Sequence, residues 1–357
     1  MKVLFLFNKV RYGKQEIENI KNGKGHDNHF YGMFRLRKQG IKTEFLELEQ
    51  FLPLSVTSFL RKYILNIFWI HIPLFPLFLR YDFVISSTAY GSLLLKAVLG
   101  LKKPKWIIID FNISGTIGEG TSLRQKVFKY AVSRADGIVT ISKAEEEKLK
   151  IMFPHLSDRI QFFHEGVDTN FFKPNESVEE EDFILSVGLD PSRDFKTLVE
   201  AAKGLGIRVK LATKPERVKA LEPLPENVTA ELFPHEEMLK EYAKAKIVVV
   251  GLNIKSDDSN DSMGTFAVAE AMSMGKAIVA TKTHSLASYI EDGVTGRLVP
   301  HHNADAMRAT ISELLTNDIM RHRIGRRARE FAVQHVEAEI FGKNLAKYLE
   351  KLDNKQQ

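Results

Sequence analysis

The chain has 357 residues, of which 44% are apolar and 27% charged, and this composition is typical of globular proteins. It excludes a disordered, collagen-like or multi-span membrane protein, and the length predicts two domains. The absence of cysteine excludes disulfides, thiolate zinc sites and a cysteine nucleophile, and is compatible with a reducing cytoplasm. The apolar run that opens the chain is too short for a secretory signal, so we expect a strand there.

The charge differs between the two halves of the chain. Residues 1–173 contain 26 Lys and Arg against 16 Asp and Glu, whereas residues 174–357 contain 25 against 29. The net charges are therefore +10 and −4. A basic first half favours an anionic partner, such as a membrane surface or a phosphorylated substrate. Nucleic acid is not expected, because the basic residues are scattered and not interleaved with aromatic ones.

In chain order, the first half alternates strand-like and helical runs, as in a parallel sheet with crossover helices. We expect helices at 31–39 and 122–135, where apolar residues recur at helical spacing. We expect strands at 2–7, 43–48, 82–86, 106–110 and 137–142.

An uncharged segment interrupts this pattern at residues 63–79. Its 17 residues are too few for a spanning helix, and Pro73 and Pro76 also argue against one. Arg61, Lys62 and Arg80 flank it, which favours a surface that enters the headgroup layer of an anionic membrane. The alternative is that the segment belongs to the core of the first domain.

The second half repeats the alternation after the acidic stretch at 173–182. We expect helices at 196–203 and 265–274 and an amphipathic helix at 337–352. Three parts follow: a first Rossmann-like domain at 1–168, a second at 169–335, and a C-terminal helix at 336–357 that packs toward the first domain. The expected strands of the second domain are 183–188, 208–213, 228–233, 247–252 and 277–281.

Several motifs are absent. The chain has no complete glycine-rich dinucleotide fingerprint, no P-loop and no zinc-protease motif, so nicotinamide chemistry and nucleotide hydrolysis are not expected. The acidic residues Asp257, Asp258 and Asp261 lack the spacing of a calcium loop, and we expect no bound metal.

The strongest signal for chemistry is residues 261–281. A strand, a polar loop ending at Gly264, and a helix beginning at Thr265 follow one another. The free N–H groups at the start of that helix suit a phosphate, and glycine lets the ligand approach the backbone. Glu270 lies one to two turns further on, where its carboxylate can accept hydrogen bonds from the hydroxyls of a ribose.

These residues resemble glycosyltransferase family 4, which has the GT-B fold. The blocks at 135–142, 164–174, 183–202, 239–252 and 285–300 resemble that family in the same order. The resemblance implies two Rossmann-like domains whose parallel sheets face a cleft. It also implies a nucleotide-diphosphate sugar bound to the second domain, an acceptor on the first, retention of the anomeric configuration and no metal or other cofactor.

The family's donor residues map onto this chain incompletely. Arg193 takes the position of a lysine that neutralises the leaving diphosphate. Lys196 is a second basic candidate, although its spacing also suggests an exposed helix residue. Leu189 departs from the family, which has a basic residue there. Ser262 departs too, because the family has a glutamate at that place. The sugar contact therefore has two alternatives: Asp261 shifted by one residue, or Ser262, Gly264 and Thr265.

On the acceptor side, Asp110 ends a predicted strand where the family often has a histidine near the reaction centre. A carboxylate there suits an acceptor hydroxyl, although it also suits the cap of a turn. Asp27 and Asn28 lie in the loop that replaces the family's glycine-rich loop, and we expect them to face the acceptor.

The predicted function is a retaining glycosyltransferase with a membrane-associated glycan or lipid-linked acceptor, in cell-surface polysaccharide or lipopolysaccharide synthesis. It is expected in the cytoplasm, peripheral at the inner face of the membrane. Two alternatives remain. One is a GT-B enzyme acting on a soluble substrate, such as a nucleotide-sugar epimerase or a sugar synthase. The other is an inactive GT-B partner subunit, which Leu189 and Ser262 favour.

Overall fold

The structure is a computed structural model and describes residues 1–8, 10–11, 15–22, 25–118, 120–255 and 263–354. The chain divides into two compact units. Unit 1 comprises Met1–Phe163 and Glu339–Gln357, and unit 2 comprises His164–Ala338. The predicted boundary at 168/169 thus lies five residues beyond the observed one at 163/164.

Unit 1 is a six-stranded parallel sheet in the order β2-β1-β3-β4-β5-β6. All five strands predicted for this half are present, with ends that differ by one to three residues. Its strands are β1 (Lys2–Leu6), β2 (Lys42–Phe45), β3 (Phe83–Ser86), β4 (Lys105–Asp110), β5 (Gly137–Thr140) and β6 (Ile160–Phe162). Its helices are α1 (Gln15–Lys21), α2 (Met33–Lys38), α3 (Leu54–Phe59), α4 (Phe75–Phe78), α5 (Tyr90–Val98), α6 (Ile113–Ile117), α7 (Leu123–Ser133), α8 (Lys143–Met152) and α14 (Ala338–Asn354).

Unit 2 is a second six-stranded parallel sheet, in the order β12-β11-β10-β7-β8-β9. Its five predicted strands are also present. The strands are β7 (Glu181–Val187), β8 (Arg208–Ala212), β9 (Val228–Glu231), β10 (Ala245–Val250), β11 (Ala277–Thr281) and β12 (Arg297–Val299). The helices are α9 (Phe195–Ala202), α10 (His235–Lys244), α11 (Thr265–Ser273), α12 (Ala304–Thr316) and α13 (Asp318–Phe331).

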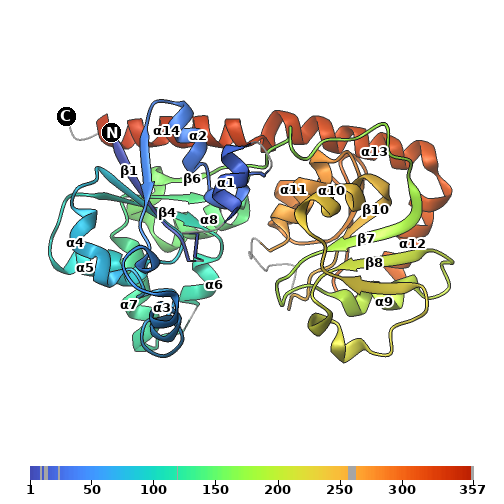
Figure 1. Ribbon diagram of the computed structural model, residues 1–357, viewed down its shortest axis with the longest axis horizontal. Coiled ribbons are helices and arrows are strands. Elements are labelled where there is room, and N and C mark those ends of the chain that lie inside the picture. Colours follow the sequence, from blue (N-terminus) through green and yellow to red (C-terminus); the bar gives the residue numbers. More distant parts are fainter. Residues whose placement is uncertain (9, 12–14, 23–24, 119, 256–262, 355–357) are drawn as a thin grey trace. The chain divides into compact units, whose positions relative to one another are not determined.

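Both sheets are covered by helices on their two faces, which explains why the strands are apolar along their whole length. In β7, Phe183 and Leu185 pack in the same cluster as residues of α10 and α11, whereas Ile184 packs with α9 and α12. Figure 1 shows α10 and α11 on one side of the sheet and α9 on the other. The strands missed from the sequence, β6 and β12, have three residues each, too few to show a pattern.

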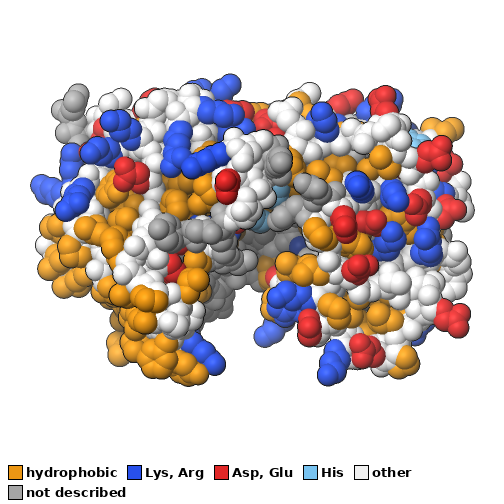
Figure 2. All heavy atoms as spheres, in the orientation of Figure 1, with side chains coloured by type: hydrophobic (Ala, Val, Ile, Leu, Met, Phe, Trp, Pro, Cys, Tyr) orange, Lys and Arg blue, Asp and Glu red, His pale blue; other side chains and the backbone are white. Residues whose placement is uncertain are grey.

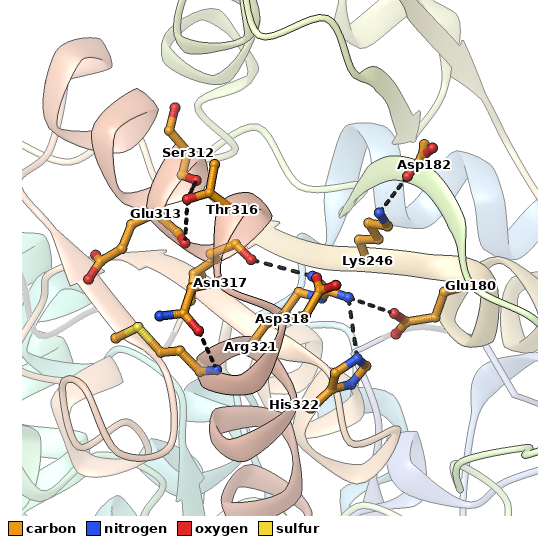
Figure 3. A network of polar contacts seen from close by, with 12 residues as sticks. Glu180, Asp182, Lys246, Ser312, Glu313, Thr316, Asn317, Asp318, Arg321 and His322 are labelled. Carbon is orange, nitrogen blue, oxygen red and sulfur yellow. Dashed lines mark hydrogen bonds and ion pairs between the residues drawn. The ribbon is translucent and has the colours of Figure 1, made fainter.

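Ion pairs hold the end of the unit 2 sheet at which β7 begins. Arg321 of α13 lies 3.2 Å from Glu180 and also contacts Asp318 and His322 (Figure 3). Lys276 approaches the other oxygen of Glu180 at 2.8 Å. These contacts lie at the amino ends of β7 and β11. The carboxyl ends of the strands, at the other end of the sheet, are therefore the place for a ligand.

The uncharged segment at 63–79 divides between surface and core. Ile70, Leu74, Phe75 and Phe78 are buried in the core of unit 1, so the core alternative holds for the second half of the segment. In the first half, Tyr63, Ile64 and Ile67 are exposed instead, whereas Leu65 is half-buried. No described helix of the chain is long and apolar enough to span a membrane.

Candidate functional site

The strand order of unit 2 places a switch point between β7 and β10. In sheets of this kind, ligands bind beyond the carboxyl ends of the strands at the point where the strand order reverses. The segment after β7 and the segment after β10 are joined there by backbone contacts. Arg193 forms a bridge with Leu252, and Asp194 N–H donates to the Gly251 carbonyl at 3.0 Å. These contacts hold the two segments together at the carboxyl ends of β7 and β10.

Arg193 lies in the segment that follows β7, with 6% of its side chain exposed. Its Nε is 3.2 Å from Oδ2 of Asp190, yet neither Nε nor Nη1 has a hydrogen-bond partner among the described residues. Burial lowers the pKa of Arg193, although arginine still keeps its charge at neutral pH. A buried cation with unused donors is a site that an anion would complete.

Two glycines make the space that Arg193 occupies. A Cβ at Gly188, directly after β7, would lie 1.9 Å from Nε of Arg193. A Cβ at Gly264 would lie 3.2 Å from Nη1. Gly264 also has a φ of +84°, a left-handed conformation that L side chains disfavour, and it is the N-cap of α11. The guanidinium is thus held against the N-terminus of that helix, where N–H groups and the helix dipole attract anions.

Glu270 lies on α11 and accepts a hydrogen bond from the Tyr242 hydroxyl at 3.2 Å. The negative charge of Glu270 raises the pKa of the positively charged Arg193, although burial lowers it more. The buried Tyr242 has a raised pKa, caused first by burial and then by the charge of Glu270. A cation, a helix N-terminus and a carboxylate are therefore brought together in unit 2.

A second carboxyl group in this cluster was missed from the sequence. Glu165 is 3% exposed, and its Oε2 accepts a hydrogen bond from Oγ1 of Thr265 at 2.6 Å. Burial, together with the charge of Glu270, raises its pKa to about 8. Its backbone N–H donates to the hydroxyl of Tyr289. The signal was present, because Glu165 stands where the resembled linker block has an asparagine.

The other predicted donor residues have different outcomes. Lys196 is exposed on α9, and its charge acts on Glu200. It therefore lies outside the cluster, although it was one of the predicted donor residues. The reason is helical geometry, because the buried face of α9 carries Phe195 and Thr197 instead. Asp261 and Ser262 lie outside the described residues, as do Asp257 and Asp258. Leu189 is half-exposed at the end of β7.

The prediction that Asp110 meets an acceptor hydroxyl needs correction. Asp110 is 1% exposed, and its Oδ1 accepts a hydrogen bond from the Ile113 N–H at 2.6 Å. Burial, and then the neighbouring carboxyl of Glu145, raise its pKa well above the usual range. Glu145 is itself bound by the N–H and hydroxyl of Ser114. Asp110 is therefore a buried carboxyl group that fixes the turn after β4.

Asp27 and Asn28 are likewise buried in unit 1, at 5% and 3% exposure. Asp27 forms a bidentate pair with Arg35, at 2.7 and 2.8 Å. Arg35 also forms an ion pair with Glu339 of α14 at 2.9 Å. This pairing uses the carboxylate of Asp27 to attach the last helix to unit 1, so the expectation that Asp27 faces an acceptor is wrong in this structure.

Comparisons with known proteins find similar glycosyltransferases. Residues 167–331 match the model of a family described as glycosyl transferases group 1. An uncharacterized glycosyltransferase of Methanocaldococcus jannaschii is 26% identical over 215 residues, covering 57% of this chain and 57% of that protein. A D-inositol 3-phosphate glycosyltransferase of a Mycobacterium species is 26% identical over 233 residues, covering 57% and 51%. The chain thus spans a little over half the length of these relatives.

Two solved structures are similar over almost the whole chain. The Anabaena protein HepE in complex with UDP-glucose has a TM-score of 0.71 at 16% identity, covering 98% of this chain and 100% of that one. Sucrose-phosphate synthase of Thermosynechococcus elongatus has a TM-score of 0.73 at 17% identity, covering 99% and 100%. At such identities the likeness shows the fold alone, and it confirms the predicted GT-B fold with two parallel sheets.

Proposed function

We propose that this chain is a glycosyltransferase that moves a sugar from a nucleotide-diphosphate donor onto a membrane-associated glycan or lipid-linked acceptor. The proposal includes the finer assignment to glycosyltransferase family 4, with retention of configuration and no requirement for a metal. It also includes a role in cell-surface polysaccharide or lipopolysaccharide synthesis, with the protein peripheral at the cytoplasmic face of the membrane. The family match over unit 2 and the glycosyltransferase relatives support the reaction class.

The observation that carries the proposal is the buried guanidinium of Arg193 at the N-terminus of α11, whose Nη1 forms no hydrogen bond with any residue that the structure describes and whose Nε has only the ion pair with Asp190. When the bond from the sugar to the diphosphate breaks, the electron pair leaves with the phosphate and negative charge develops there. A fixed guanidinium and the first N–H groups of a helix stabilise that charge without having to reorganise. Glu270, further along the same helix, is suited to accept hydrogen bonds from the ribose hydroxyls of the donor.

The first experiment is thermal stabilisation by UDP, GDP, ADP and CMP, with and without magnesium. A ligand that binds only the native state raises Tm. We expect one nucleoside diphosphate to do so equally well with and without magnesium, and this result would identify the donor class. A flat panel in folded protein would instead favour the inactive partner subunit, with Leu189 and Ser262 as lost donor contacts.

The variant Arg193→Gln tests the site itself. A charged hydrogen bond contributes about 1.5–3 kcal/mol, so the variant should lose about 10- to 100-fold in affinity for the diphosphate. Arg326→Gln is the matched control, because it removes the same charge from an exposed position on α13 of the same unit. If both variants bind the nucleotide as well as the wild-type protein, Arg193 does not hold the diphosphate.

The alternative of a GT-B enzyme with a soluble substrate shares this donor site. Transfer from the identified nucleotide sugar separates the two cases. A product formed on a water-soluble acceptor, with no gain on lipid-linked acceptors, would refute the membrane part of the proposal while leaving its donor part standing.

A further inference from the structure

Residues 51–67 of unit 1 expose large apolar side chains to an unusual extent. The segment consists of a loop, helix α3, a π-helical turn (Leu60–Ile64) and a second short loop. Figure 2 shows hydrophobic side chains gathered at the lower left, where Figure 1 labels α3. Soluble monomers rarely expose a large contiguous apolar patch unless it binds something. The side chains that carry the patch are 44% to 64% exposed: Phe51, Leu54, Phe59, Tyr63, Ile64 and Ile67.

This exposure is not the result of a loose segment. Arg61, in the middle of the π-helical turn, donates to both carboxylate oxygens of Glu49, at 2.9 and 3.1 Å. Glu49 is 8% exposed, and Thr57 of α3 is fully buried. Next along the chain, Ile70 and Leu74 are anchored in the core. The apolar side chains are therefore presented outward by a segment that is fixed at both ends and in its middle.

Helix α7 packs against Phe68 and Trp69, which directly follow this segment in the chain. Phe128 on the buried side of α7 contacts the rings of Phe68 and Trp69, at centroid distances of 4.9 and 6.3 Å. The guanidinium of Arg124 lies over the rings of Phe68 and Phe128. On its outer side, α7 exposes Leu123, at 78%. We call residues 51–67 together with α7 the docking face.

The charge of the docking face has one sign. Residues 51–67 include Lys62 and Arg61, the latter paired with Glu49, but no Asp or Glu. Residues 120–135 likewise lack acidic side chains, and α7 exposes Lys126 and Lys129 beside Arg124. A second copy of the chain would bring like charges together at a two-fold interface, which disfavours a homodimer through this face. A partner that offers both an apolar phase and negative charge would match the apolar and the basic side chains of the docking face.

We infer that the docking face binds a lipid bilayer with anionic headgroups, with its apolar side chains entering the headgroup layer and its basic side chains above them. Apolar burial and electrostatic attraction add up in such interfacial binding. The docking face would bring the acceptor side of the enzyme to a lipid-linked substrate, and that part of the inference rests on the proposed function. Membrane binding itself requires neither donor nor catalysis.

Flotation with vesicles tests the inference in the absence of nucleotide. The full chain is mixed with vesicles of phosphatidylcholine and phosphatidylglycerol, or of phosphatidylcholine alone. We expect strong binding to the anionic vesicles at about 0.1 M salt and weak binding at about 1 M, where the Debye length falls to about 3 Å. Failure of the wild-type protein to bind anionic vesicles at the lower salt would overturn the inference.

Two matched pairs of variants locate the surface. Ile64→Ser should weaken vesicle binding about tenfold, because burying an isoleucine contributes about 1.5–3 kcal/mol. Ile151→Ser is the control, since Ile151 is 81% exposed in the same unit but lies on α8. Lys126→Gln/Lys129→Gln should weaken binding about 30-fold at about 1 kcal/mol per charge. The control Lys343→Gln/Lys347→Gln removes the same charge from exposed positions of α14.

Each outcome decides a different point. If the variants of the docking face bind vesicles as well as their controls do, the location is wrong. If sedimentation shows a dimer that Ile64→Ser dissociates, and vesicles are not bound, the face is an interface between two copies instead. Nucleotide binding is measured separately without vesicles. Failure of the docking face therefore leaves the donor site standing, and failure of the donor site leaves the docking face standing.

Discussion

The first prediction concerns the pH dependence of stability that Glu165 causes. The carboxyl group is buried beside Thr265 and near Glu270, and burial is the main reason that its pKa rises from an ordinary 4.5 to about 8. At neutral pH the native protein therefore holds a proton on Glu165 that the unfolded chain releases. Where the unfolded state binds fewer protons than the native state, the free energy of unfolding falls as pH rises.

The magnitude follows from the two pKa values. One pKa unit corresponds to about 1.4 kcal/mol, so the range from 4.5 to about 8 corresponds to about 5 kcal/mol. This destabilisation grows between pH 4.5 and pH 8 and is constant at higher pH. Glu165→Gln keeps an oxygen that can accept the hydrogen bond from Thr265 but has no proton to lose. The variant should therefore gain stability over the wild-type protein as pH rises through this range.

Urea unfolding at several pH values between 5 and 9 measures the effect. Circular dichroism reports both units, whereas tryptophan fluorescence reports unit 1, because the two tryptophans, Trp69 and Trp106, both lie there. Glu200→Gln, at an exposed position of α9, is the control for loss of a carboxylate in unit 2. A stability difference between Glu165→Gln and wild type that stays constant within about 1 kcal/mol over this pH range would refute the reasoning.

Three further predictions concern the same units. Glu270→Gln should reduce nucleotide affinity about tenfold in calorimetric titration while leaving Tm nearly unchanged, and unaltered affinity would remove Glu270 from the site. Gly188→Ala should abolish nucleotide binding, because the new methyl group displaces Arg193, and tight binding by this variant would show that the guanidinium is dispensable. Asp110→Asn should retain most transfer activity, because the carboxyl group is buried and its Oδ1 accepts a hydrogen bond within the turn after β4, which an amide oxygen can also do, whereas a loss of more than about 100-fold in kcat would restore Asp110 to a direct role.

Much of the fold could be predicted from the sequence, because a strand covered on both faces is apolar along its whole length. The runs at 106–110, 247–252 and 277–281 are such strands, and each was predicted. The sequence also predicted the neighbourhood of Gly264 and Glu270, because a glycine before a helix and a carboxylate within it are local features. Such local features can be predicted from a sequence, since they depend on residues only a few positions apart.

Only the tertiary structure decided which polar residues are available to a ligand. Asp110, Asp27 and Lys196 were plausible site residues by type and position, yet pairing and burial occupy the first two and helix orientation turns the third outward. Glu165 enters the site through Thr265, which is 100 residues away in the chain. Burial and pairing between distant segments are properties of the packed core, and these determine the charge and reach of a side chain, so the pattern of a single sequence does not contain them.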